Sequence, residues 1–366
     1  MLVISVIARL GVLPSAIVTS YQHLPQTRLL LTSTRQDKSL CTDTSLGVTA
    51  QLSMEDELYD TSWTLYFIAN TTALYRNFAS SDQGSLNGRA RQFRDYISSN
   101  RPRYEDEEEQ EKIGTLRDCT WSRLGKGNTR TARKGIVVSL DYDKTTYKFV
   151  FYDDVHANFA SLPLLLAKAS ASLTKKFASF LSETFDVSVN PLRLPPSLLQ
   201  TTLQSYLQNI RSAFELDDSA DTLQFLRPAL GSLRLTISFS SLVAPHLRTL
   251  EVDVPPETTL QLSRSSTASN ISFLQELARH LYNRTGLKIP VLSSSEDGQS
   301  VIDGEDAVFR ISKIACAAYS LSIDSRIRFM YKAVEGSDKH ELVIRKANDG
   351  MMGDLIEKAT RMGQNG

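Results

Sequence analysis

The chain has 366 residues, enough for two modest domains or for one large domain with extensions. Hydrophobic residues make up 41% of it and charged residues 22%, values that exclude a wholly disordered chain. Lys plus Arg and Asp plus Glu both number 41, so the net charge is zero. Any surface that binds nucleic acid must therefore come from local segregation of charge.

Cysteine and histidine spacings predict neither a disulfide framework nor a local metal site. Cys41, Cys119 and Cys316 lie far apart with no C-x-x-C pair, and the five histidines are scattered singly. This pattern favours a reducing compartment and no metal or cofactor. No apolar run approaches the roughly 20 residues that cross a bilayer.

Residues 1–53 are expected to form a poorly structured extension. The first acidic residue is Asp37, whereas Arg9, Arg28 and Arg35 come before it. That bias also resembles a mitochondrial presequence, so an organellar protein is an alternative. Met54 is an alternative natural start, because the patterned chain begins directly after it.

Strand patterns dominate the first half of the patterned chain. Residues 58–68 and 116–124 predict strands carrying Trp63 and Trp121, and a short helix is expected around Phe93. Alternation from Ile136 to Phe151 predicts a hairpin. The acidic run 105–111 and the basic stretch 125–135 are expected to be loops.

Helices are expected next, followed by more strands. The helical predictions are an opening turn at 161–166 with Pro163, then 173–185 and 199–214. After a polar junction at Asp217, Asp218 and Asp221 come strands at 233–239 and 250–254 and a helix at 270–285 that ends at Gly286. Residues 291–305 are expected to form a loop; strand-like segments follow at 306–323, 325–333 and 341–346, and a short helix at 350–361.

The order of these segments predicts an α+β fold of mainly antiparallel, curved sheets with packed helices, because short turns join neighbouring strands. We expect an N-terminal α/β domain at 54–216, made of a sheet plus helices. A C-terminal β-rich domain with partner-binding strands is expected at 217–366.

No catalytic constellation is apparent, and we expect no enzyme. The chain lacks G-x-G-x-x-G, P-loop and G-x-S-x-G motifs. Asp153, Asp154 and His156 are compatible with an acid/base or metal site, but a polar turn after the hairpin explains them better.

A basic segment is the first candidate interaction feature. Seven basic residues against one acidic residue lie between Lys112 and Lys134, and a loop within it is a candidate for proximity to DNA through Arg123, Lys126, Arg130, Arg133 and Lys134. The alternative is that these cations neutralise the neighbouring acidic run. No aromatic residues interleave with the basic ones, which disfavours a single-strand reader.

The C-terminal strands are the second candidate feature. An exposed edge strand there would need a partner, and sheet extension would supply one; an ordinary closed sheet is the alternative. The candidate partner-binding residues are Tyr319, Leu321, Ile323, Ile327, Phe329, Leu342 and Ile344.

The ordered set of segments resembles fungal members of the centromere protein L family. The segments that carry the resemblance are LYDTSWTLY (58–66), LRDCTWSRL (116–124), GIVVSLDYDKTTYKFVFY (135–152), ASLPLLLAKASASLTKKFASFLSETFDVSVNPLRL (160–194), LRLTISF (233–239) and LRTLEVDVP (247–255). Together they span about 58–346. Residues 1–53 and the acidic run are not part of the family pattern.

The resemblance implies a non-enzymatic subunit of the inner kinetochore, in the nucleus at the centromere. It implies pairing with a centromere protein N-like subunit through C-terminal β-structure, contacts with other inner-kinetochore subunits, and help in holding centromeric DNA beside the nucleosome. It implies no membrane and no small-molecule substrate. A small organellar enzyme and a stand-alone DNA-binding protein are the alternatives.

Overall fold

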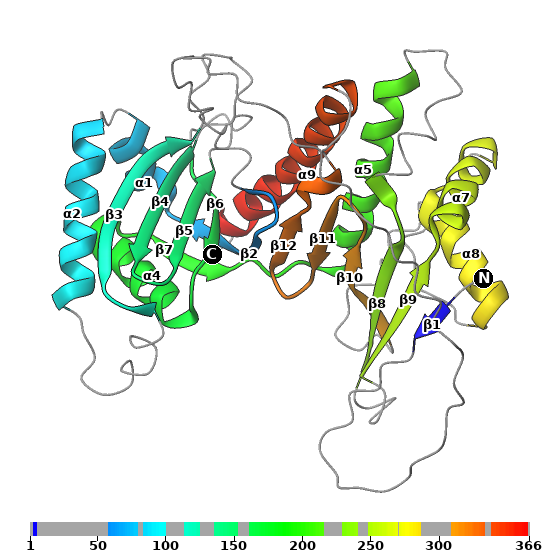
Figure 1. Cartoon of the computed structure of the whole chain (residues 1–366), viewed down its shortest axis with the longest axis horizontal. Coiled ribbons are helices and arrows are strands. Elements are labelled where there is room, and N and C mark those ends of the chain that lie inside the picture. The colour runs from blue at the N-terminus through cyan, green and yellow to red at the C-terminus, as the bar shows by residue number, and fades with distance from the viewer. Residues whose placement is uncertain are drawn as a thin grey trace, which may run out of the picture.

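The computed structural model describes eleven segments of the chain: residues 3–5, 58–79, 83–99, 113–124, 135–152, 161–215, 229–240, 248–269, 271–286, 309–333 and 338–364. Their strands join into one sheet in which every ladder is antiparallel, and helices pack against it (Figure 1). The α+β class with antiparallel sheets that the sequence predicts is confirmed.

The sheet runs in the order β1-β9-β8-β10-β11-β12-β2-β6-β5-β4-β3, and β7 also pairs with β2. The strands are β1 (Val3–Ser5), β2 (Ser62–Ala69), β3 (Leu116–Leu124), β4 (Gly135–Tyr142), β5 (Thr146–Tyr152), β6 (Leu164–Lys168), β7 (Ser188–Pro191), β8 (Leu233–Phe239), β9 (Thr249–Val254), β10 (Phe309–Ala315), β11 (Tyr319–Ser322) and β12 (Arg326–Phe329). Segments distant in sequence thus become neighbours at β2, which lies between β12 and β6.

The helices fall into two groups along the chain. Those associated with the β2–β6 part of the sheet are α1 (Thr71–Ala79), α2 (Gln83–Ser99) and α4 (Ala171–Phe185). Those associated with the β8–β12 part are α5 (Pro196–Glu215), α7 (Pro256–Ser269), α8 (Phe273–Thr285) and α9 (Asp338–Gln364), with a 3-10 turn, η2, at Tyr331–Ala333. Figure 1 shows the first group beside β3–β6 and the second beside β8–β12.

Strand β2 divides the hydrophobic interior into two clusters. Successive side chains of a strand point to opposite faces. Trp63 and Leu65 enter a cluster with α5, α9 and the β8–β12 strands, whereas Ile68 enters a cluster with α1, α2 and α4. The helices therefore cover opposite faces of the sheet on the two sides of β2.

The cluster around β3–β6 is rich in aromatic rings. Trp121 of β3 is 1% exposed, and its ring lies 5.6 Å from that of Phe78, 6.2 Å from Phe177 and 6.4 Å from Phe151. Phe149 stacks on Phe177 at 4.1 Å. Aromatic rings at alternating positions of the strands thus pack against the apolar side of α4.

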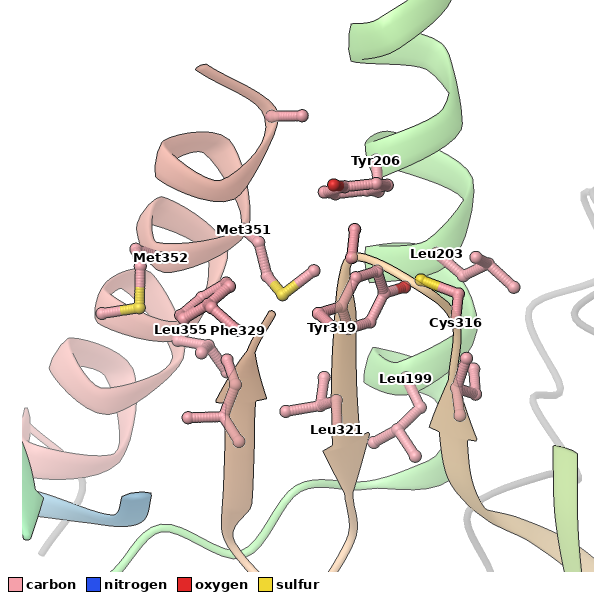
Figure 2. Packing of buried hydrophobic residues seen from close by; sticks show 14 of the residues in the cluster. Leu199, Leu203, Tyr206, Cys316, Tyr319, Leu321, Phe329, Met351, Met352 and Leu355 are labelled. Carbon is pink, nitrogen blue, oxygen red and sulfur yellow. The ribbon is translucent and has the colours of Figure 1, made fainter. Parts of the chain in front are cut away.

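The cluster around β8–β12 is mostly aliphatic, with methionine. In Figure 2, Tyr319 of β11 lies on the side of α5, near Leu203 and Cys316, while Met351 and Leu355 of α9 lie beside Phe329. Several polar residues are also buried in this half, and one hydrogen-bond network joins three segments. Asn348 of α9 accepts a hydrogen bond from the Tyr206 hydroxyl at 3.2 Å and donates one to the Tyr59 hydroxyl at 3.0 Å.

Gly350 of α9 lies close to the Asn209 side chain of α5. A Cβ atom at Gly350 would lie 2.7 Å from Nδ2 of Asn209. Glycine costs about 1 kcal/mol relative to alanine inside a helix, and a side chain at position 350 would need the Asn209 amide to shift.

Two local predictions were wrong. Residues 161–166 contribute to strand β6 and not to a helical turn. Leu164 and Leu166 face one cluster and Leu165 the other, all fully buried. A strand buried on both faces appears as an unbroken apolar run, which periodicity cannot distinguish from a helix.

The other wrong prediction was the strand at 341–346, which is the first part of α9; the helix expected at 350–361 is its continuation. Buried residues recur along α9 at helical spacing, including Val343, Ala347, Met351 and Leu355. The β-branched pair Val343–Ile344 favoured a strand locally, but tertiary packing of this stripe decides the helix. Helix α7 was not predicted, although Pro256 opens it as a first-turn proline.

Other predicted elements are confirmed within a few residues. They are the strands at 58–68, 116–124, 233–239 and 250–254, the 136–151 hairpin, and the helices at 173–185, 199–214 and 270–285. Gly286 ends α8 with φ 71°. Most of residues 1–53 and the whole of 105–111, 125–134 and 291–305 lie outside the described residues. The division into domains at 54–216 and 217–366 stays a prediction.

Candidate nucleic-acid interface

The basic loop predicted to approach DNA is described only at its beginning. Arg123 is exposed on β3, whereas Lys126, Arg130, Arg133 and Lys134 lie outside the described residues. Asp153, Asp154 and His156 also lie outside them. The structure therefore neither brings these loop residues together nor separates them.

The predicted partner-binding residues lie mainly in the interior. Tyr319, Leu321, Ile327, Phe329 and Ile344 are at most 2% exposed, and Ile323 is partly buried. Leu342 alone among them is strongly exposed, at 68%. Strands β10, β11 and β12 are each paired on both sides, so none of them is a free edge of the sheet. Their apolar side chains hold the chain's own core in place (Figure 2).

The opposite face of the same strands is basic. Arg310 and Lys313 of β10 and Arg326 and Arg328 of β12 are all exposed. We call these four residues the cationic face. They alternate with core residues such as Ile311 and Ile327, so the pleat of each strand separates an apolar side from a basic one.

Hydroxyl side chains lie between these cations. On β11, Ser322 is the cross-strand partner of both Arg326 and Lys313, and Ser320 is the partner of Arg328. Adjacent strands are about 4.8 Å apart, so β10 and β12 place their cations roughly 10 Å apart across this row of serines. Small hydroxyl residues leave the long basic side chains accessible.

A β-bulge keeps Lys313 on this face. The register of β10 on β8 shifts between Ile311 and Lys313, which adds one residue, Ser312. As a result Ile311 and Ile314 are both buried although they are three positions apart. Ser312 bonds Ser238 at 2.6 Å and the carbonyl oxygen of Thr236 at 3.1 Å, which anchors the bulge.

The cations of this region differ in whether a carboxylate holds them. Arg234 of β8 donates to Asp253 of β9 at 2.6 Å, and this bond raises the pKa of Arg234. Arg328 lies 3.8 Å from Asp60, a long and exposed ion pair that is weak in water. Across the described segments, Arg310, Lys313 and Arg326 form no ion pair. No carboxylate of the described residues therefore neutralises these three charges.

A second exposed feature is an apolar patch beside the start of α9. We define it as Tyr59, Tyr331, Leu342 and Arg345. The Tyr59 ring lies 5.9 Å from that of Tyr331, and the Arg345 guanidinium lies 5.3 Å from the Tyr59 ring centre. Leu342 is three residues before Arg345 on α9, so both lie on one side of the helix.

Sequence reasoning did not single out the cationic face, although a signal for it was present. The stretches FRISKI (309–314) and RIRF (326–329) alternate basic and apolar residues. That alternation indicates a strand with one buried and one basic face. The apolar half of the pattern was read as a binding surface because an exposed edge was expected there.

The arrangement provides positive charge and hydroxyl groups, with no grouping suited to bond-making chemistry. Among the described residues, no group of three His, Cys, Asp or Glu side chains could hold a metal ion. None of the helices in these segments is both long and apolar enough to span a membrane. Such a surface suits phosphate contacts.

The sequence model of the family described as centromere protein L matches residues 57–360, which is most of the chain and includes every helix and strand described here except β1 and the end of α9. No curated protein matches the chain. The family is one of structural centromere and kinetochore proteins and is not a known enzyme family, which implies a nuclear location at the centromere. By the extent of this match, the chain belongs to the centromere protein L family.

Proposed function

We propose that this chain is a non-enzymatic structural subunit of the inner kinetochore that holds centromeric double-stranded DNA while paired with a centromere protein N-like subunit. The observation that carries the DNA part is the cationic face. Three of its four cations form no ion pair in the described segments, and all four project from rigid, fully paired strands. Family membership supports the centromeric setting.

Physical chemistry favours contact with the DNA backbone over base reading on this face. Arg and Lys side chains that neutralise phosphates release counterions, which makes affinity fall with salt by about 0.9 log units per phosphate contact and per log unit of salt. Ser320 of β11, which is partly exposed, can add a hydrogen bond to a phosphate oxygen, whereas Ser322 is buried. Such binding is independent of sequence and suits a subunit that holds chromatin.

The DNA test is a double charge reversal, Arg326→Glu with Arg328→Glu. We expect affinity of the complex for a 30-base-pair duplex to fall more than tenfold at low salt, and the salt slope to flatten by about two. The matched control is Arg91→Glu with Arg94→Glu, two exposed arginines on α2 in the other half of the sheet. Equal losses in both variants would show that net charge, and not this face, governs binding.

For pairing, we propose that the apolar patch contacts the centromere protein N-like subunit. Leu342 lies within the C-terminal part from which pairing was expected and is the most exposed large hydrophobic residue described. Aromatic and arginine side chains are typical of energetically important interface positions. The patch combines the strongly exposed Leu342 with Tyr331 and Arg345 and so has this composition.

The pairing test is Leu342→Asp, with Tyr282→Asp as control. Tyr282 is 55% exposed on α8, so both variants place a charge at an exposed apolar position. Leu342→Asp should weaken pairing at least tenfold in a co-purification titration, whereas Tyr282→Asp should not. Both should keep the melting temperature of the isolated chain. If Leu342→Asp paired as tightly as the native chain, the patch would not be the contact with the partner subunit.

A further inference from the structure

Carboxylates border the cationic face on its β9 side. One row across the strands runs Arg326, Ser322, Lys313, Thr236 and Glu251, in the order β12 to β9. The next row runs Arg328, Ser320, Ala315, Arg234 and Asp253. Both rows begin with a cation on β12 and end with an acid on β9.

The charge along these rows changes sign in steps. Strand β8 is effectively neutral on this face, because Arg234 is held by Asp253 and its other side chains here are Thr236 and Ser238. Glu251 forms no ion pair within the described segments; the nearby Arg234, whose pKa it helps to raise, is already hydrogen-bonded to Asp253. The basic strands β10 and β12 and the acidic strand β9 are thus separated by one neutral strand.

Glu251 is close enough to affect a phosphate bound over β10. Strands β9 and β10 lie two positions apart, which corresponds to roughly 10 Å. That is about one Debye length at 0.1 M salt, so the repulsion between the carboxylate and a phosphate is reduced but not removed. A duplex lying over β9 would meet Glu251 directly.

We propose that Glu251, supported by Asp253, is a positioning group that confines the duplex to β10–β12 and excludes it from β9. This inference rests on the proposed DNA-holding function. Its physical content is repulsive: the cationic face attracts the phosphate backbone, and the β9 carboxylates set where the attraction ends. The duplex then leaves β9, which lies between β1 and β8, uncovered on this face.

The first test measures DNA binding by the full chain with Glu251→Lys. The variant gives phosphates an added contact over β9, so affinity for a 30-base-pair duplex should rise severalfold and the salt slope should steepen by about one. The control is Asp95→Lys, the same charge change at an exposed acid on α2. Glu251→Gln should raise affinity by less, and provides the same test if the lysine variant does not fold.

The second test locates the duplex. A photo-crosslinking amino acid at Ser320 of β11 should capture DNA in the native background and in Glu251→Lys. The same probe at Thr249 of β9 should capture DNA only in Glu251→Lys. Capture at Thr249 in the native background would overturn the boundary.

The outcomes separate this inference from the function beneath it. If reversal of Arg326 and Arg328 lowers affinity but Glu251→Lys leaves both affinity and slope unchanged, the boundary is wrong and the DNA-holding face stands. If neither reversal nor Glu251→Lys changes binding, both proposals fail.

Discussion

The two halves of the sheet, β3–β6 and β8–β12, use opposite faces for their cores. In the first half, Trp121 and Phe149 face α2 and α4; in the second, Tyr319 and Ile327 face α5 and α9. The first core consists largely of interlocked rings, the second of aliphatic and methionine side chains. Because the covered face changes at β2, the second half presents a basic surface on the side where the first half packs its helices.

This difference teaches that one continuous sheet can separate stability from binding. The aromatic half has mixed charges at its exposed end, such as the Arg117–Asp143 pair at 2.5 Å. The aliphatic half keeps Arg310, Lys313 and Arg326 without ion pairs in the described residues. We expect the halves to respond differently when each is perturbed.

The largest expected effect is that of Trp121→Ala, which removes the central ring of the aromatic half. It should lower the free energy of unfolding by about 3–5 kcal/mol in urea titrations. Burial raises the pKa of the Cys119 thiol to about 12 and that of Cys316 to about 11, so both should react slowly with iodoacetamide while the protein is folded.

Thiol labelling shows which half opens. Cys119 lies on β3 in the aromatic half, and Cys316 lies between β10 and β11 in the aliphatic half. In Trp121→Ala we expect Cys119 to react faster while Cys316 stays protected. Equal acceleration at both thiols would contradict separate opening and would count against a two-domain division.

A smaller effect, of opposite sign at two neighbouring positions, is expected within the aliphatic half. The rings of Tyr206 and Tyr319 lie 4.9 Å apart (Figure 2). The Tyr206 hydroxyl donates a hydrogen bond to Asn348, whereas the buried Tyr319 hydroxyl has no hydrogen-bond partner among the described residues. Tyr206→Phe should destabilise by about 1 kcal/mol, and Tyr319→Phe should be neutral or stabilise by about 1 kcal/mol.

Thermal and urea unfolding of Tyr206→Phe and Tyr319→Phe measure these effects. Each variant is a control for the other, because both lose only a tyrosine hydroxyl oxygen. A clear loss of stability in Tyr319→Phe would mean that its hydroxyl has a partner in solution.

The smallest effect concerns pH and the exposed end of the aromatic half. Hydrogen bonds from the Thr115 hydroxyl, from Arg117 and from the Thr115 amide hold the pKa of Asp143 well below its usual range. Because the pKa of Asp143 is lower in the folded state than in the unfolded state, its carboxylate stabilises the folded state at neutral pH. This stabilisation is lost as the pH falls below the unfolded-state pKa of about 4.

Melting temperatures between pH 7 and pH 3 test this. Asp143→Asn should have a slightly lower melting temperature than the native chain at pH 7. Its melting temperature should fall less than that of the native chain when the pH is lowered below 4. Asp95→Asn, an exposed acid on α2, should follow the native curve. If the melting temperatures of Asp143→Asn and of the native chain changed with pH in parallel, the Asp143 carboxylate would not contribute to the pH dependence of stability.

Much of the fold could be predicted because local patterns agree with tertiary packing. The alternation in β4 and β5 and the stripe in α4 need no knowledge of the rest of the chain. The sequence could not show which strands are edges, since β12 pairs with β2 across more than 250 residues. Tyr319 and Phe329, which we expected to bind a partner, lie on the buried side of strands whose exposed side is basic, and their role in pairing stays a prediction.

The two wrong predictions, at residues 164–166 and in α9, have a common physical origin: contacts with distant segments outweigh the local sequence pattern. Leu164–Leu166 is apolar throughout because it lies between two cores, and α9 was divided because Asn348, Asp349 and Gly350 interrupt its propensity. Asn348 is explained by its hydrogen bonds to two tyrosines, and Gly350 lies opposite the Asn209 side chain of α5. Such residues are unfavourable locally and are understood only from their neighbours.

The position of β2 also has a consequence for biosynthesis. Trp63 pairs across the sheet with Ile327, so its strand is completed only when the last fifth of the chain is available. At ribosomal rates of 5–20 residues per second, about 13–50 s separate the synthesis of these two partners. During that interval Trp63 and Leu65 lack the surface that buries them. A nascent chain of this protein should therefore bind chaperones until translation approaches its end.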